Sequence, residues 1–455
     1  MNLEQLRKQA KELVKAARAG DAHAVGRLGG REPILANAQL ALAREHGHRS
    51  WPALVAAAEA GADAFVVAAT SGRRDRAEAM LAARPELERN PWAGLVLGRG
   101  WDGDPNAPGG PRGWPPIVYV THSVFAPLGL GRELLERGAD PNASYENEYG
   151  RMSALYGAAG ILHDPELTRL LLEAGADPDD GESVYHATES PSPECLRLLL
   201  EHGAEPRGTN ALAHALDDER YEHLRLLLEH GADPREGATV AHAVRRGRGP
   251  GEVRLLVEHG ADVEAPGGET WRGGVPLRTP YQHAILRNRR DLADELARLG
   301  ASTEVAPEDT AVAAVARGER VALAGPLDVD QQEVLILAAL GGRLEPVVDA
   351  VGVDFAGVVG GSPSGTLLHH GAWVGSSEVV RELLARGADP VAASDATFST
   401  PLAWAALGSQ AYRLPGRDYV AVAEALEEAG AELEPRFLEV AHGPFLAWLE
   451  ERLAA

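Results

Sequence analysis

The sequence predicts an all-α solenoid of helix-turn-helix repeats with short β-hairpin fingers. Two recurring motifs support this prediction: a leucine-rich segment that ends in Gly-Ala-Asp-Pro, and a segment beginning with Thr or Ser that precedes it. The length is a third observation, because 455 residues exceed what one compact hydrophobic core accommodates. Hydrophobic residues make up 45% of the chain, so the repeats have enough apolar surface to pack on one another.

The leucine-rich motif predicts the second helix of each repeat. Its leucines stand at helical spacing and form an apolar face. The glycine ends the helix in a left-handed conformation, and the proline that follows prevents its continuation. The segments are RELLERGADPN (132–142), TRLLLEAGADPD (168–179), LRLLLEHGAEPR (196–207), LRLLLEHGADPR (224–235), VRLLVEHGADVE (253–264), ELARLGASTE (295–304), RELLARGADPV (381–391) and ALEEAGAEL (425–433).

The other motif predicts the first helix of each repeat. Its Thr or Ser caps the helix N-terminus, and proline fits the first turn that follows. The segments are SALYGAA (153–159), SVYHAT (183–188), TVAHAV (239–244), TPYQHA (279–284), TLLHHGA (366–372) and TPLAWAA (400–406).

Together these motifs resemble the ankyrin repeat, whose pattern is T-P-L-H-x-A-A, a second helix, and then L-L-x-x-G-A-D-P. The resemblance covers roughly residues 64–433 and gives about eleven repeats, with poor matches near 309–328 and 331–360. It implies an ankyrin solenoid. It also implies that the motif histidines are structural and bond within and between loops; these are His186, His214, His242 and His369.

Finger length follows from the spacing of the motif glycines. Successive glycines from Gly138 to Gly300 are separated by 37, 28, 28, 29 and 40 residues, against about 33 in the ankyrin family. The 28-residue units therefore have short fingers. The 37- and 40-residue units carry long ones, at 143–152 and 264–278.

The chain divides into three expected parts. Residues 1–60 form three or four short amphipathic helices, similar to the N-terminal segment of some bacterial ankyrin-repeat proteins, and serve as a cap. Residues 61–433 form the repeat array, irregular at 89–115, 264–278 and 304–364. Residues 434–455 form a C-terminal capping helix.

The charge is strongly acidic. Lys and Arg number 44 and Asp and Glu 67, a net charge of −23; residues 1–60 contribute +3, which leaves −26 for residues 61–455. This balance argues against nucleic acid binding by the array and predicts a partner protein with a basic patch. The N-terminus lacks a signal-peptide pattern and no apolar stretch reaches membrane-spanning length, so we expect a cytoplasmic protein with no membrane partner.

Candidate binding residues come from the repeat register. In ankyrin-like units, the residue after the motif histidine and the pair after Ala-Ala face the concave groove. Aromatic, imidazole and charged side chains stand there, as in binding hot spots. With the long fingers and the aromatic-rich stretch, the candidates are Trp114, Tyr119, His122, Tyr145, Tyr149, Tyr156, Asp218, Arg246, Trp271, Arg272, His283, Arg287, His370, Trp373 and Trp404.

Aromatic residues are concentrated near one insertion. Eight of the 17 Trp and Tyr residues lie between Trp92 and Tyr185. Two interpretations remain open: the rings form an exposed binding site, or they fill the space beneath the Pro-rich insertion 101–116 as a satellite core.

No motif identifies a reaction. The chain has no G-x-S-x-G elbow, no H-E-x-x-H and no P-loop, so we expect no catalytic residue, metal or cofactor. Its single cysteine, Cys195, is expected to pack in the core. Asp102, Asp104 and Asn106 alternate as in a calcium loop, but Ala107 replaces the required glycine, which favours a turn.

The leading hypothesis is a non-catalytic protein–protein interaction module, acting as a monomer and binding through the groove and fingers. The alternative is a small-molecule-binding protein or enzyme with a groove pocket roofed by 101–116. His122 would then be the first catalytic candidate, because it is a groove histidine outside the motif position. A DNA-mimicking inhibitor ranks last, because arginines such as Arg246 and Arg287 interrupt the acidic surface.

Overall fold

The computed structural model describes residues 3–268, 276–360, 362–394, 396, 399–411 and 416–454. The chain divides into two compact units, Met1–Asp233 (unit 1) and Pro234–Ala455 (unit 2). Both are all-α and solenoid-like, as predicted.

Unit 1 begins with helices that have a small core of their own. Leu13, Leu28 and Leu42 are buried together there, each at most 4% exposed. The last of these helices spans the boundary expected at residue 60. The four helices are α1 (Leu3–Arg18), α2 (Ala22–Arg27), α3 (Leu35–Glu45) and α4 (Trp51–Ala69).

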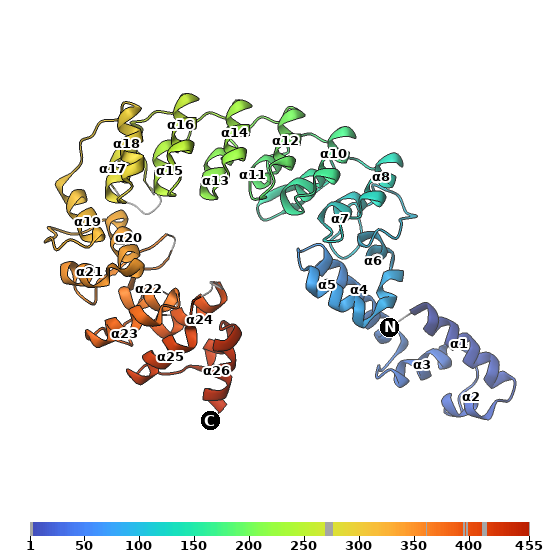
Figure 1. Ribbon diagram of the computed structural model, residues 1–455. Coiled ribbons are helices and arrows are strands. Elements are labelled where there is room, and N and C mark those ends of the chain that lie inside the picture. Colours follow the sequence, from blue (N-terminus) through green and yellow to red (C-terminus); the bar gives the residue numbers. More distant parts are fainter. Residues whose placement is uncertain are drawn as a thin grey trace. The chain divides into compact units, whose positions relative to one another are not determined.

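The rest of unit 1 consists mainly of helix pairs. Figure 1 shows the second helices α8, α10, α12 and α14 as one row and the first helices α7, α11 and α13 as another. The bounds are α5 (Arg74–Ala83), the 3-10 helix η1 (Pro85–Arg89), α6 (Pro91–Val96), α7 (Pro116–His122), α8 (Leu128–Glu136), α9 (Ala154–Tyr156) continued by η2 (Gly157–Ile161), α10 (Pro165–Glu173), α11 (Ser183–Ala187), α12 (Glu194–Glu201), α13 (Ala211–Asp217) and α14 (Tyr221–Glu229).

Local chemistry explains these pairs. The Asp164 carboxylate accepts hydrogen bonds from two backbone N–H groups in the first turn of α10, at 2.9 and 3.0 Å. Leu171 of α10 and Leu199 of α12 are fully buried, and burial of such side chains stabilises the fold by about 1.5–3 kcal/mol each. Gly175 and Gly203 follow these helices with φ of 94° and 95°, as the termination motif predicts.

Asparagine side chains join successive repeats of unit 1. The amide of Asn106 donates to the Gly138 carbonyl oxygen at 2.8 Å and accepts from the Asp140 N–H at 2.7 Å. Asn142 makes the same two bonds one repeat later, to Gly175 and Asp177. The stretch considered for calcium is therefore the predicted turn, with Asn106 bonding the following repeat.

Unit 2 continues the pairing with one irregular element. The expected poor repeat near 309–328 has only one helix, α19, which is followed by a stretch without regular structure at residues 318–328. The bounds are α15 (Thr239–Arg245), α16 (Pro250–Glu258), α17 (Pro280–Leu286), α18 (Arg290–Arg298), α19 (Pro307–Arg317), α20 (Val329–Ala338) continued by η4 (Ala339–Arg343), α21 (Leu344–Val351), α22 (Leu367–Trp373), α23 (Ser377–Ala385), α24 (Pro401–Ala411), α25 (Tyr419–Glu428), η5 (Pro435–Glu439) and α26 (Gly443–Ala454).

The fingers are short antiparallel hairpins. Strands β1 (Ser144–Asn147) and β2 (Gly150–Ser153) pair with Ser144 opposite Ser153, which confirms the long finger predicted at 143–152. Strands β3 (Ala356–Gly357) and β4 (Gly365–Thr366) form a second hairpin. The predicted finger at 264–278 is closed by a bridge between Gly267 and Arg278, and 269–275 lie outside the described residues.

A buried ionic cluster lies at the base of that finger in unit 2. Arg278 is 4% exposed and donates to both carboxylate oxygens of Asp309, at 2.8 and 2.7 Å. It also donates to Asp328 at 2.6 Å and to Asp330 at 3.3 Å. Burial alone would lower the pKa of Arg278, but its hydrogen bonds to Asp309 and Asp328 raise it above the usual value.

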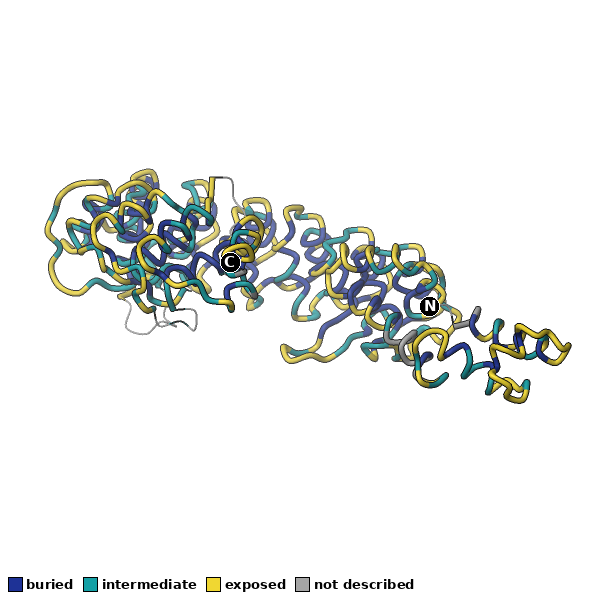
Figure 2. The backbone as a smooth tube through the Cα atoms, turned by 90° about the horizontal axis from the view of Figure 1, so that it is seen from below, coloured by how far each residue is buried: buried dark blue, intermediate teal, exposed yellow. Residues whose placement is uncertain are grey.

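Burial follows the helices of the repeats. Figure 2 shows them largely buried, with the connecting turns more exposed. Cys195 is buried as predicted, and burial raises the pKa of its thiol to about 11. Within the described part of the chain, no helix is both long and apolar enough to cross a membrane.

Candidate binding surfaces on the first helices

The insertion 101–116 in unit 1 packs onto aromatic side chains. A Cβ at Gly109 or Gly110 would lie 2.6 Å from the Trp92 ring, so only glycine allows this close approach. The guanidinium of Arg112 lies over the Trp114 ring at 4.7 Å and donates to the Thr70 hydroxyl at 2.7 Å. The insertion is thereby fixed between α4 and α7.

This packing buries three of the candidate residues. Trp114, Tyr119 and His122 are 6%, 0% and 2% exposed. The expectation that Tyr119 and His122 face an open groove is therefore wrong, because the insertion and its rings cover them. For these residues the satellite-core interpretation is correct.

His122 has a specific environment. Its Nδ1 donates to the Val118 carbonyl oxygen at 2.9 Å, which leaves Nε2 as a buried acceptor with no hydrogen-bond partner among the described residues. Burial lowers the pKa of His122 to about 4, so the ring is neutral at pH 7. A buried ring of this kind is not the accessible acid/base that the enzyme alternative required.

The other rings form a half-buried series, which we call the aromatic ladder: Tyr145, Tyr156, Tyr185, His186 and His214. Tyr145 stacks on Trp114 with ring centroids 4.2 Å apart. The ladder continues from Tyr156 to His186 at 5.1 Å, from His186 to Tyr185 at 4.9 Å, and from Tyr185 to His214 at 4.2 Å. Tyr156, Tyr185 and His214 come from the first helices α9, α11 and α13.

The residue that follows the position of the motif histidine forms a hydrogen bond to an insertion or finger in both units. In unit 1, the Tyr119 hydroxyl donates to the Gly109 carbonyl oxygen at 2.8 Å. In unit 2, His283 donates to the Gly267 carbonyl oxygen at 2.8 Å. Because His283 is fully buried by this contact, its predicted position in an exposed groove is also wrong.

The motif histidines make the loop contacts that the resemblance implies. His369 Nε2 donates to the Ser399 carbonyl oxygen at 2.8 Å, and its Nδ1 accepts the Thr366 N–H at 3.1 Å. His214 Nδ1 lies 2.7 Å from the Thr188 hydroxyl in the preceding repeat. For these histidines the prediction of a structural role is confirmed.

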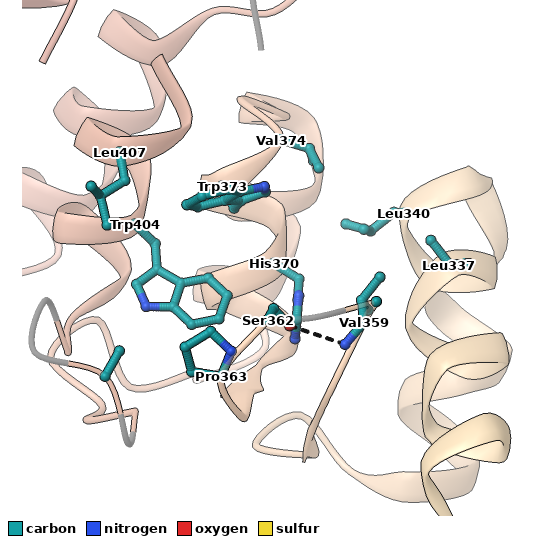
Figure 3. Close-up of a pocket in the computed structure, with 12 residues that line it drawn as sticks. Leu337, Leu340, Val359, Ser362, Pro363, His370, Trp373, Val374, Trp404 and Leu407 are labelled. Atoms are coloured by element: carbon teal, nitrogen blue, oxygen red, sulfur yellow. Dashed lines mark hydrogen bonds between the residues drawn. The ribbon is translucent and has the colours of Figure 1, made fainter. Parts of the chain in front are cut away.

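Unit 2 contains an apolar pocket that brings three candidates together (Figure 3). His370 and Trp373 come from α22, and Trp404 comes from α24. The Trp404 ring lies 5.2 Å from His370 and 5.9 Å from Trp373, centroid to centroid. The cavity measures about 580 Å³ and is also lined by Leu337, Leu340, Val359, Gly360, Ser362, Pro363, Val374, Ala396 and Leu407.

Three polar groups of this pocket have partners inside the protein. His370 Nε2 donates to the Gly357 carbonyl oxygen at 3.1 Å, and burial lowers the pKa of the ring. The Ser362 hydroxyl accepts the Val359 N–H at 3.1 Å, and the Gly360 N–H donates to Glu333 at 2.9 Å. An occupant therefore meets mainly carbon surface, including Leu337, whose side chain is 46% exposed.

A second cavity of about 430 Å³ in unit 2 is lined by arginines. The candidates Arg246 and Arg287 lie there with Arg245 and Arg289, which the sequence reasoning missed. Arg287 donates to Glu333 at 2.9 Å, and Arg289 pairs with Asp291 at 2.7 Å. Part of this positive charge is thus neutralised internally.

The remaining candidates lie apart from these sites. Tyr149, at the tip of the β1–β2 finger, is 80% exposed, and Asp218 is exposed at the end of α13. Trp271 and Arg272 lie outside the described residues. No group of three or more His, Cys, Asp or Glu within the described ranges is arranged to hold a metal ion.

Comparison with known proteins finds a family match in two parts of the chain. A family model of three ankyrin repeats matches residues 155–238, and a model of a single ankyrin repeat matches residues 365–396. These two parts of the chain therefore match ankyrin repeats, and such repeats are generally protein–protein interaction modules. Comparison with curated proteins finds no match.

Two solved structures are similar to parts of the chain. The ankyrin repeat domain of Bcl-3, described as a unique member of the IkappaB protein family, is 28% identical over 41% of this chain and 86% of its own, with a TM-score of 0.33. An ankyrin repeat domain from Acinetobacter baumannii AYE is 24% identical over 41% of this chain and 98% of its own, with a TM-score of 0.35.

Proposed function

We propose that the chain is a non-catalytic interaction protein that binds a segment of a partner protein on its first helices and fingers. The observation that carries this proposal is the apolar pocket between α20, α22 and α24. A solvent-open cavity with two tryptophans and several leucines is the type of surface that receives an anchoring side chain.

The pocket is pre-organised for such an anchor. Trp404 is 3% exposed and held by its contacts to His370 and Trp373, so little side-chain freedom is lost when an occupant enters. At about 580 Å³, the cavity has room for a large apolar side chain. We therefore expect the partner segment to place a leucine, methionine or aromatic residue here.

The charge supports a finer statement about the partner. With −26 outside the first 60 residues, the chain attracts a protein surface with a basic patch. We further propose that it acts as a monomer, so sedimentation should give one species of about 48.1 kDa. A stable dimer would contradict that part of the proposal.

A peptide-display experiment tests the proposal. Random peptides are selected on the full chain, and the affinity of each selected peptide is measured for wild type, Leu337→Glu and Tyr221→Glu. Leu337 lines the pocket, whereas Tyr221 is 41% exposed on the second helix α14 and serves as the matched control.

Leu337→Glu should weaken binding by about tenfold or more, since it places a charge in the apolar cavity. Tyr221→Glu should leave binding unchanged. Failure to select any peptide, or equal binding by both variants, would overturn the proposal.

A further inference from the structure

Beside the aromatic ladder of unit 1 lie several carboxylates. Glu182 and Glu189 contact the two ring nitrogens of His186, at 3.4 and 2.8 Å. Asp217 is exposed at the end of α13, close enough to Tyr185 in the ladder to act on its hydroxyl. We infer that the ladder from Tyr156 to His214 binds arginine or lysine side chains in a basic segment of the partner protein. This inference deepens the proposed function and rests on it.

The ladder offers a row of free acceptors. Within the described residues, none hydrogen bonds to the hydroxyls of Tyr145, Tyr156 or Tyr185. A guanidinium carries five N–H donors in a planar fork, so it can donate to hydroxyl and carboxylate oxygens while its plane lies against a ring. Half-buried tyrosines with unused hydroxyls match that geometry.

The electrostatic field at the ladder is negative. Burial, together with the neighbouring Tyr145, Glu182 and Glu189, raises the pKa of Tyr156 to about 12. Burial also raises the pKa of Tyr185, and Glu189 and Asp217 contribute in the same direction. Negative charges that disfavour the deprotonated tyrosine hydroxyl favour a cation at the same place. Aromatic faces attract cations independently of those charges.

A cation near the ladder, Arg220, is itself paired with a carboxylate. Arg220 pairs with the exposed Asp218 at 3.8 Å and donates to the Glu189 backbone carbonyl oxygen at 3.2 Å. Within the described residues, the carboxylates of Glu182 and Glu189 contact the imidazole of His186. A phosphate backbone would be repelled here, so the surface suits a basic protein segment rather than a nucleic acid.

Fluorescence anisotropy with synthetic probes tests the inference. The probe is a labelled peptide of repeated Gly-Ser-Arg units, and two companions replace arginine with citrulline or with glutamate. Citrulline keeps the shape and removes the charge. The full-length variants are Glu189→Gln and Tyr185→Leu, with Glu201→Gln as matched control, because Glu201 is an exposed carboxylate on the second helix α12.

The arginine peptide should bind the wild type, and the citrulline and glutamate peptides should not. Binding should weaken about threefold to tenfold in Glu189→Gln and about tenfold in Tyr185→Leu, while Glu201→Gln stays within error. Glu189→Gln removes the charge and preserves the local fold, because the amide oxygen still accepts a hydrogen bond from His186. Equal losses in Glu189→Gln and Glu201→Gln, or binding of the citrulline peptide, would overturn the inference.

One variant separates this inference from the proposed function. Leu337→Glu lies in unit 2 and should leave binding of the arginine peptide unchanged. If display-selected peptides depend on Leu337 but the arginine peptide does not bind, the ladder inference fails and the proposed function stands.

Discussion

The imidazole of His370 donates to the carbonyl oxygen of Gly357 at 3.1 Å. The same bond joins His283 to Gly267 at 2.8 Å. In both cases the glycine belongs to the strand pair or bridge that closes a finger, and the histidine stands directly after the motif position. A side chain expected to face a partner instead holds the finger against the first helices.

Gly267→Ala should test this close packing. An added Cβ would lie 2.7 Å from the Ala241 Cβ, so the finger base must shift, at a cost of about 1–3 kcal/mol. Urea denaturation followed by circular dichroism should show an earlier transition. Gly129→Ala is the control: nothing lies within 4 Å of its added Cβ, so the transition should stay or move later. An unchanged midpoint in Gly267→Ala would contradict the packing described.

Stability should fall with acidity because of buried histidines. Burial lowers the pKa of His122 to about 4 and that of His283 to about 3. The unfolded chain protonates them near pH 6.5, whereas the folded chain does not. The contribution of these two neutral histidines to the free energy of unfolding should therefore be complete above pH 6.5. It should decrease as the pH falls toward 4, by about 1.4 kcal/mol per pH unit for each histidine.

The histidine contribution can be isolated by substitution. His122→Asn retains a donor near the Nδ1 position and removes the titrating ring, so its stability should depend less steeply on pH than that of the wild type. His23→Gln changes an exposed histidine and serves as the control. Identical slopes for wild type and His122→Asn, from urea titrations at several pH values, would refute this assignment.

Arg278→Met should destabilise unit 2 strongly. It would leave Asp309 and Asp328 without their cation in a buried setting, which costs about 3–5 kcal/mol. Arg320→Met removes an exposed pair with Glu345 and should cost less than about 1 kcal/mol. Thermal unfolding of both variants compares them directly. Similar melting temperatures would show that the buried cluster stabilises the fold no more than the exposed ion pair does.

Binding of a basic partner should weaken as salt increases. The acidic surface acts through charges exposed to solvent, and raising the salt from about 0.1 M to about 1 M shortens the screening length from about 10 to 3 Å. Isothermal titration of the arginine peptide at several salt concentrations measures this. Affinity independent of salt would point to apolar contacts in place of the carboxylates beside the aromatic ladder.

The repeating elements could be predicted from the sequence because each has a local cause. The capping residues, the leucine spacing and the terminating glycines identified the helix pairs, and the 37-residue spacing indicated the β1–β2 finger. The burial of Tyr119 and His283 could not be predicted, because it depends on fingers folding back onto the first helices.

The apolar pocket was only partly predictable. His370, Trp373 and Trp404 follow from the register, but Leu337 and Leu340 lie in a poorly matching repeat and carry no motif signal. The irregular repeat with the single helix α19 precedes Leu337 and Leu340 and interrupts the repeat register. The position of these two leucines therefore depends on tertiary packing. The arginines Arg245 and Arg289 were missed for a similar reason, since each flanks a register position without occupying it.

Hydrogen–deuterium exchange tests the central claim most directly. A display-selected peptide is added to the full chain, and amide exchange is compared with and without it. Binding on the first helices predicts slower exchange in α20, α22 and α24, around Leu337, Trp373 and Trp404. Protection confined to the second helices α21, α23 and α25, with α20, α22 and α24 unchanged, would contradict the account.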